Sequence, residues 1–169
     1  MDILLIIILI FAPVPIFHFW LHAMLAFWRK NPVLFYLLCL LCWIASFFVL
    51  KMASENSYYA YYPDSFSIVL GFLSVVAGFI LIASSILTIG PKRFFMWAVL
   101  NPSSVKQKRI VSGFFKIIPH PAYLGELLVP LGTFLLSGKT YIGIIFIYML
   151  SLMPIVIYFE EKELSERTK

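Results

Sequence analysis

Residues 119–162 read PHPAYLGELLVPLGTFLLSGKTYIGIIFIYMLSLMPIVIYFEEK. Two apolar runs are separated by Gly-Lys-Thr at 138–140, a pattern that favours a turn. Since about 20 apolar residues span a bilayer, the runs predict a helical hairpin that crosses the membrane twice. If the chain folds back at the turn, His120 and Glu160 lie at a similar depth on one side. Ionisable side chains are costly beside lipid, so the proximity of His120 and Glu160 suggests a functional site.

The composition predicts an integral membrane protein. Apolar residues make up 62% of the chain and charged residues 12%, and the mean hydropathy is +0.97. A soluble domain has about a quarter charged residues. The runs are too uniformly apolar for a barrel, whose strands alternate in polarity. We therefore expect an all-α, polytopic membrane helix bundle in a single domain, residues 1–169.

Five apolar segments are candidate transmembrane helices, at 3–28, 33–52, 66–89, 122–137 and 141–159. Backbone polar groups must be satisfied inside lipid, so these spans are helices. Pro13 and Pro15 predict a kink in the first. This segment lacks a basic N-terminal region and is expected to be a retained helix, not a cleaved signal peptide.

The basic residues predict the orientation of the bundle. Of the 13 Lys and Arg residues, all except Lys51 and Lys139 fall in loops expected on one side of the membrane. Basic loops favour the cytoplasm, which places the N-terminus outside, the C-terminus inside and the His120 site facing the cytoplasm. This asymmetry accounts for the net charge of +5, and basic residues near the cytoplasmic leaflet also attract anionic lipid headgroups. Nucleic acid is excluded as a partner, because no aromatic stacking face accompanies the basic residues.

Smaller motifs have structural and functional interpretations. His18 and His22 are spaced i, i+4 and share a helix face. With His120 they offer an alternative function, a non-enzymatic haem- or small-molecule-binding or transport protein. No further ligands follow at a suitable spacing, so we expect no metal site and favour hydrogen bonds to neighbouring helices. Cys39 and Cys42 are expected to pack as apolar residues.

Two further segments predict close helix packing and a cover over the site. A stripe of small residues on the third span indicates close helix packing: Gly71, Ser74, Gly78 and Ser85. Apolar residues at 94–100, beside basic residues, predict an interfacial helix that covers the site. Pro121 predicts a helix start with His120 as its N-cap residue, where free N–H groups favour an anion.

The residues around His120 and Pro121 resemble the signature of a known family. The C-terminal part of the chain, roughly its last 60 residues, resembles the isoprenylcysteine carboxyl methyltransferase family and the related phospholipid methyltransferases. Phe115 stands where that family usually has Tyr. The matching residues are Gly113, His120, Pro121, Tyr123, Gly125, Glu160, Glu161 and Leu164.

This resemblance implies an S-adenosylmethionine-dependent membrane methyltransferase. Its acceptor is expected to be a lipophilic or lipidated molecule that enters from the bilayer, either isoprenylcysteine carboxylate-like or phospholipid-like. His120 and Tyr123 are the expected catalytic residues, and Glu126 and Tyr158 the expected substrate contacts. The expected cofactor-binding residues are Gly113, His120, Tyr123, Gly125, Glu160 and Glu161.

Two departures from the signature leave the acceptor open. Pro119 and Tyr158 stand where the family usually has Arg. Arg is the natural partner of a substrate carboxylate. The acceptor atom therefore stays open between oxygen, nitrogen and sulfur, as do loss of activity and the oligomeric state.

Overall fold

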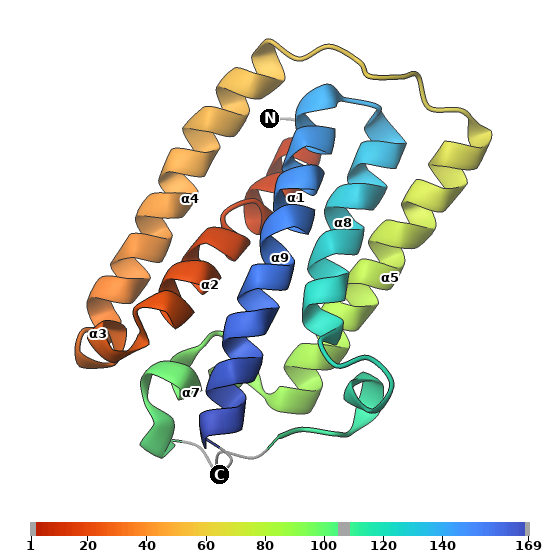
Figure 1. Ribbon diagram of the computed structural model, residues 1–169. Coiled ribbons are helices and arrows are strands. Elements are labelled where there is room, and N and C mark those ends of the chain that lie inside the picture. Colours follow the sequence, from red (N-terminus) through yellow and green to blue (C-terminus); the bar gives the residue numbers. More distant parts are fainter. Residues whose placement is uncertain (1–2, 105–108, 168–169) are drawn as a thin grey trace.

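The computed structural model describes residues 3–104 and 109–167, with the side chains described as far as Ser165. It shows a bundle of long helices and, over these ranges, no β-strand (Figure 1). The all-α prediction is therefore confirmed. The helices are α1 Ile3–Phe11, α2 Val14–Ala23, α3 Leu25–Lys30, α4 Pro32–Glu55, α5 Ser65–Ile89, α6 Pro91–Phe94, α7 Trp97–Leu100, α8 Pro121–Ser137 and α9 Thr140–Arg167, with 3-10 turns η1 Pro102–Ser104 and η2 Gly113–Lys116.

The predicted spans match the long helices. Four stretches are long and apolar enough to cross a membrane, namely 3–23, 32–55, 65–89 and 140–165, and α8 is a shorter apolar helix. The predicted kink is confirmed, because α1 ends at Phe11 and α2 starts at Val14, on either side of Pro13. The expected end of the first span at residue 28 was wrong. The chain breaks again at Met24, and α3 is a separate short helix.

Helices α5 and α8 approach each other closely through glycines. A Cβ atom on Gly132 would lie 2.5 Å from the carbonyl oxygen of Gly71, and one on Gly125 would lie 2.6 Å from that of Gly78. In both helices the two glycines are seven residues apart, about two helical turns, and so share a face. The predicted small-residue packing is confirmed for Gly71 and Gly78 of this stripe.

A clasp joins the two loops at the end of the bundle farthest from α7 (Figure 1). Helix α8 ends at Ser137 and is capped by Gly138, which has a φ of 63°, and α9 begins at Thr140, as the hairpin predicted. The α4–α5 loop binds this turn through two backbone hydrogen bonds. The Ala60 N–H donates to the Gly138 carbonyl at 2.7 Å, and the Thr140 N–H donates to the Tyr58 carbonyl at 3.1 Å. The clasp fixes where the hairpin reverses and therefore which residues of α8 and α9 meet at the other end.

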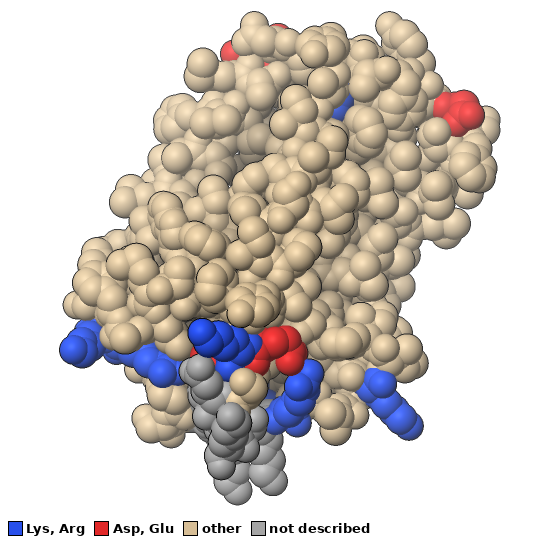
Figure 2. Space-filling view, in the orientation of Figure 1, with Lys and Arg blue, Asp and Glu red and all other residues tan. Residues whose placement is uncertain are grey.

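Basic side chains gather at the end of the bundle that carries α7 and the C-terminal end of α9 (Figures 1 and 2). The opposite end shows few charges. The segregation expected from the sequence is therefore present in the fold.

The cover differs from the single interfacial helix expected at 94–100. It consists of α6 and α7, separated by a break at Met96, whose φ is 61°. Met96 and Leu100 are buried against Phe17 and Phe35, because this apolar cluster offers more burial than the membrane surface. The cover thus packs against α3 and α5, and its buried side chains reach residues of α2 and α4.

Candidate active site

The hairpin brings its two polar ends together. His120 Nε2 lies 3.0 Å from Glu161 Oε1, and His120 Nδ1 lies 3.7 Å from Glu160 Oε2. His120 is the N-cap residue of α8, and Pro121 is the first helical residue, as predicted. His120 is 40 positions from Glu160 and 41 from Glu161 in the sequence, yet the three side chains form one polar cluster at the basic end of the bundle.

The two glutamates of this cluster have different surroundings. Glu161 Oε1 accepts from Arg109 Nη2 at 3.0 Å and also contacts His120. Glu160 Oε2 is buried and has no hydrogen-bond partner among the described residues. Glu161 is thus occupied in holding Arg109 and His120, whereas Glu160 keeps an oxygen available to a ligand.

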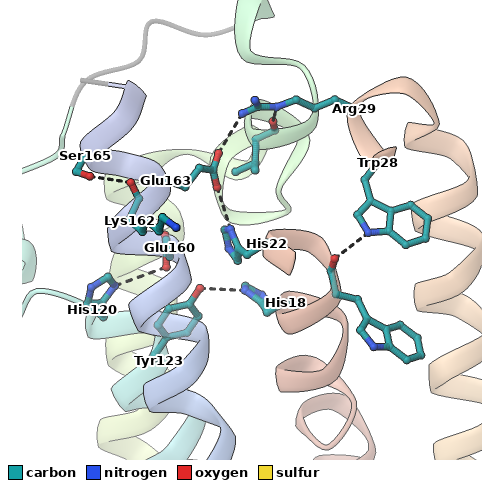
Figure 3. A network of polar contacts seen from close by, with 12 residues as sticks. His18, His22, Trp28, Arg29, His120, Tyr123, Glu160, Lys162, Glu163 and Ser165 are labelled. Atoms are coloured by element: carbon teal, nitrogen blue, oxygen red, sulfur yellow. Dashed lines mark hydrogen bonds and ion pairs between the residues drawn. The ribbon is translucent and has the colours of Figure 1, made fainter. Parts of the chain in front are cut away.

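Tyr123 connects this cluster to the N-terminal helices. Its ring stacks on that of His120, with 5.6 Å between the ring centres and 16° between the planes. Its hydroxyl lies 2.9 Å from Nδ1 of His18 on α2 (Figure 3). Both Tyr123 and His18 are buried.

A second cluster lies beside the first (Figure 3). Glu163 is buried and binds His22 Nδ1 at 2.9 Å and Arg29 Nη2 at 3.0 Å. Arg29 also donates from Nε to the carbonyl of Val99, next to the cover. The prediction that His18 and His22 bind neighbouring helices is confirmed. Within the described ranges, no group of three or more His, Cys, Asp or Glu side chains is arranged to hold a metal ion.

A large apolar cavity of about 580 Å³ opens beside these clusters. Its walls come from α1, α2, α4, α5, α8 and α9 and from the cover. His18, Tyr123, Glu126 and Glu160 supply polar groups. Glu126 is only 7% exposed, and its Oε2 has no hydrogen-bond partner within the described chain. Buried polar groups are normally paired, so two unpartnered carboxylate oxygens in one cavity point to a ligand.

A smaller cavity of about 130 Å³ adjoins the large one. Charged and imidazole side chains line it, from Arg93, Arg109, His120, Glu160 and Glu161. Arg93, His120 and Glu160 line both cavities. These three residues therefore mark the junction of a polar and an apolar chamber.

Three residues named by the resemblance lie elsewhere. Gly125 faces α5 and serves helix packing. Gly113 has a φ of 58° and lies beside Thr88. Tyr158 is 65% exposed on α9 and lines neither cavity. The structure therefore gathers His120, Tyr123, Glu126, Glu160 and Glu161, but not these three.

Sequence reasoning missed several residues that the fold adds to the site. Arg93 comes from α6 of the cover, Arg109 from the loop before η2, and Glu163 from the C-terminal glutamate run. Arg93 and Arg109 lie beside His120 and Glu161, close to the Pro119 position where the family usually has Arg. The density of basic residues between 92 and 116 was the available signal, but it fits a membrane surface equally well.

Comparison with known proteins agrees with this geometry. The family model described as phospholipid methyltransferase matches residues 66–168, from α5 to the end of α9. Searches of curated proteins and of solved structures found no match to the chain. The matched region contains the α5–α8 glycine contact and both polar ends of the hairpin. The chain therefore belongs to the phospholipid methyltransferase family and is a membrane methyltransferase that acts on lipid.

Proposed function

We propose that the chain transfers a methyl group from S-adenosylmethionine to the amine of a lipid headgroup, at the junction of the two cavities. The observation that carries this proposal is the junction itself, where a polar chamber and an apolar chamber share Arg93, His120 and Glu160. Walls from α1, α2, α4, α5, α8 and α9 surround the site, which supports residues 1–169 acting as one catalytic domain.

The polar chamber suits the charged end of the cofactor. S-adenosylmethionine supplies a methyl group on a positively charged sulfur, together with an ammonium and a carboxylate. Arg109 and His120 offer partners for the carboxylate, and the unpartnered oxygen of Glu160 offers one for a cation. Methyl transfer requires alignment and the exclusion of water, which the burial of this junction favours.

The apolar chamber suits a lipid that enters sideways. Helix α4 packs against α1, α2, α3 and α9, whereas α5 packs mainly against α8. The side of the cavity between α4 and α5 is therefore not closed by a packed helix pair, and Trp43 and Phe79 line it. Acyl chains are compatible with such a wall.

The charges favour an amine as the acceptor group. Glu126 and Glu160 each have an unpartnered carboxylate oxygen, and Glu160 is close enough to interact electrostatically with Glu126. The Glu160 carboxylate repels an acceptor carboxylate and attracts an ammonium group, and the Glu126 carboxyl group can accept a hydrogen bond from it. Arg93 on the same cavity wall suits the phosphate of a zwitterionic headgroup.

A binding and transfer experiment tests this function. Purified protein in detergent is expected to bind S-adenosylhomocysteine in calorimetry. In vesicles of phosphatidylethanolamine and phosphatidylglycerol it is expected to move tritiated methyl groups from S-adenosylmethionine into the phosphatidylethanolamine fraction. Vesicles of phosphatidylglycerol alone are the control and should stay unlabelled. Absence of S-adenosylhomocysteine binding would refute the proposal, whereas binding with label in phosphatidylglycerol would refute only the amine.

The basic end of the bundle is proposed to face the cytoplasm, where the cofactor is made. Because the native cysteines are Cys39 and Cys42 alone, single cysteines can be placed in a cysteine-free background at Ser103 and Asn56, which are exposed at opposite ends. An impermeant thiol reagent on intact cells is expected to label position 56 and to spare position 103 until the cells are opened. The reverse pattern would contradict the cytoplasmic site.

A further inference from the structure

The buried pair of Tyr123 and His18 has no role in holding the cofactor or the lipid as described above. The Tyr123 hydroxyl lies 2.9 Å from His18 Nδ1, across 105 residues of sequence. Both side chains line the apolar cavity. In the tautomer of His18 that carries its proton on Nε2, the Tyr123 hydroxyl donates to Nδ1.

We propose that His18 receives, through Tyr123, the proton that the acceptor loses on methylation. This inference rests on the proposed function, because an amine loses a proton when it gains a methyl group and remains neutral, whereas a carboxylate loses none. Tyr123 touches the acceptor in this scheme, and His18 acts through Tyr123.

The step balances in atoms and charge. The acceptor reacts as the neutral amine, its ammonium proton having been released to solvent on entry. Its nitrogen lone pair forms a bond to the methyl carbon, and the methyl–sulfur bond breaks with its electron pair going to sulfur. The acceptor N–H proton passes to the Tyr123 hydroxyl oxygen, while the hydroxyl's own proton passes to His18 Nδ1. The positive charge that leaves sulfur therefore ends on the His18 imidazolium.

A positive charge on His18 is short-lived, because burial and the neighbouring His22 oppose it. The groups that face the pair are His22 on α2, Glu126 on α8, and Glu160 and Glu163 on α9. His22 is bonded to Glu163, and the Glu126 and Glu160 oxygens that lack a hydrogen bond lie in the same cavity, where these carboxyl groups offset part of that cost. His120 is less suited to this task, because Glu161 already holds its Nε2.

Tyr148→Phe provides a matched control for Tyr123→Phe. Tyr148 lies on α9 and packs against the same apolar cluster as Tyr123. Its hydroxyl is buried without a hydrogen-bond partner in the described structure, and it lines neither cavity. Both substitutions remove one buried hydroxyl, but only Tyr123→Phe interrupts the proposed proton path.

The test compares single-turnover methyl transfer into phosphatidylethanolamine vesicles among the variants. Tyr123→Phe and His18→Gln are each expected to slow transfer about 100-fold, the range of general acid–base catalysis. Combining them is expected to add little, because they interrupt one path. Tyr148→Phe is expected to keep the wild-type rate. S-adenosylhomocysteine affinity should be unchanged in all four variants.

Imidazole rescue separates proton transfer from a structural role. In His18→Gly, added imidazole should restore transfer. Absent rescue, or a rate loss matched by loss of S-adenosylhomocysteine binding, would overturn the inference. Failure of the wild-type protein to bind S-adenosylhomocysteine would instead overturn the proposed function on which it rests.

Discussion

Glu160→Gln is expected to weaken S-adenosylhomocysteine binding about 10- to 100-fold while leaving the bundle folded. Glu160 Oε2 is buried and lacks a hydrogen-bond partner among the described residues, so it is the oxygen available to a cofactor cation. A hydrogen bond to a charged group contributes about 1.5–3 kcal/mol, which corresponds to this range of affinity. Calorimetry on the purified variant measures the change.

Glu161→Gln is the matched control, since it makes the same change one residue away. Glu161 Oε1 is already bonded to Arg109 and His120. Loss of the Glu161 charge is expected to loosen His120 and Arg109. It should reduce the affinity for S-adenosylhomocysteine less than Glu160→Gln does. Wild-type affinity in Glu160→Gln, or a larger loss in Glu161→Gln, would show that the two roles are assigned the wrong way round.

Gly132→Val is expected to destabilise the bundle by about 3 kcal/mol or more, a large effect for one substitution. Even a Cβ atom at this position would lie 2.5 Å from the Gly71 carbonyl oxygen and 2.8 Å from the Val75 nitrogen, both of which belong to the α5 backbone. The helices must separate to admit the side chain, which moves His120 and Tyr123 on α8. Thermal unfolding in detergent, followed by circular dichroism, measures the loss.

Gly143→Ala serves as the comparison for this prediction. A Cβ atom there would meet ring atoms of Phe134, the nearest at 2.8 Å, and no backbone atom is among its three nearest neighbours. The Phe134 ring is able to turn aside, so the expected cost is smaller. Equal unfolding temperatures for Gly132→Val and Gly143→Ala would refute the claim that the α5–α8 backbone contact limits stability.

Most of the helical architecture was predictable from the sequence. Apolar runs of membrane-spanning length can only be helices in lipid, so the positions of α4, α5, α8 and α9 followed from hydropathy alone. The break after α1 followed from Pro13, which lacks a backbone donor. The extra break at Met24 and the split of the cover at Met96 did not follow, because no glycine or proline marks them. The split at Met96 accompanies the packing of Met96 and Leu100 into the apolar cluster, which is a tertiary contact.

Part of the site was also predictable. The lengths of the two hairpin arms brought His120 level with Glu160 and Glu161, because a helix rises by a fixed distance per residue. Sequence did not separate the roles of the two glutamates. That difference depends on Arg109, which reaches Glu161 from the loop before η2. Nor did it show that Tyr158 points outward while Glu126 lines the cavity.

The sequence by itself thus determined a membrane-embedded α-helical bundle, its hairpin, and the meeting of His120 with two glutamates, because length, hydropathy and helical rise are local properties. Only the tertiary structure decided that His18 meets Tyr123, that Glu163 joins His22 to Arg29, and that Arg93 lies between two cavities. These contacts join helices far apart in the chain. They depend on how α2, α8, α9 and the cover pack together, and no spacing within one segment encodes that packing.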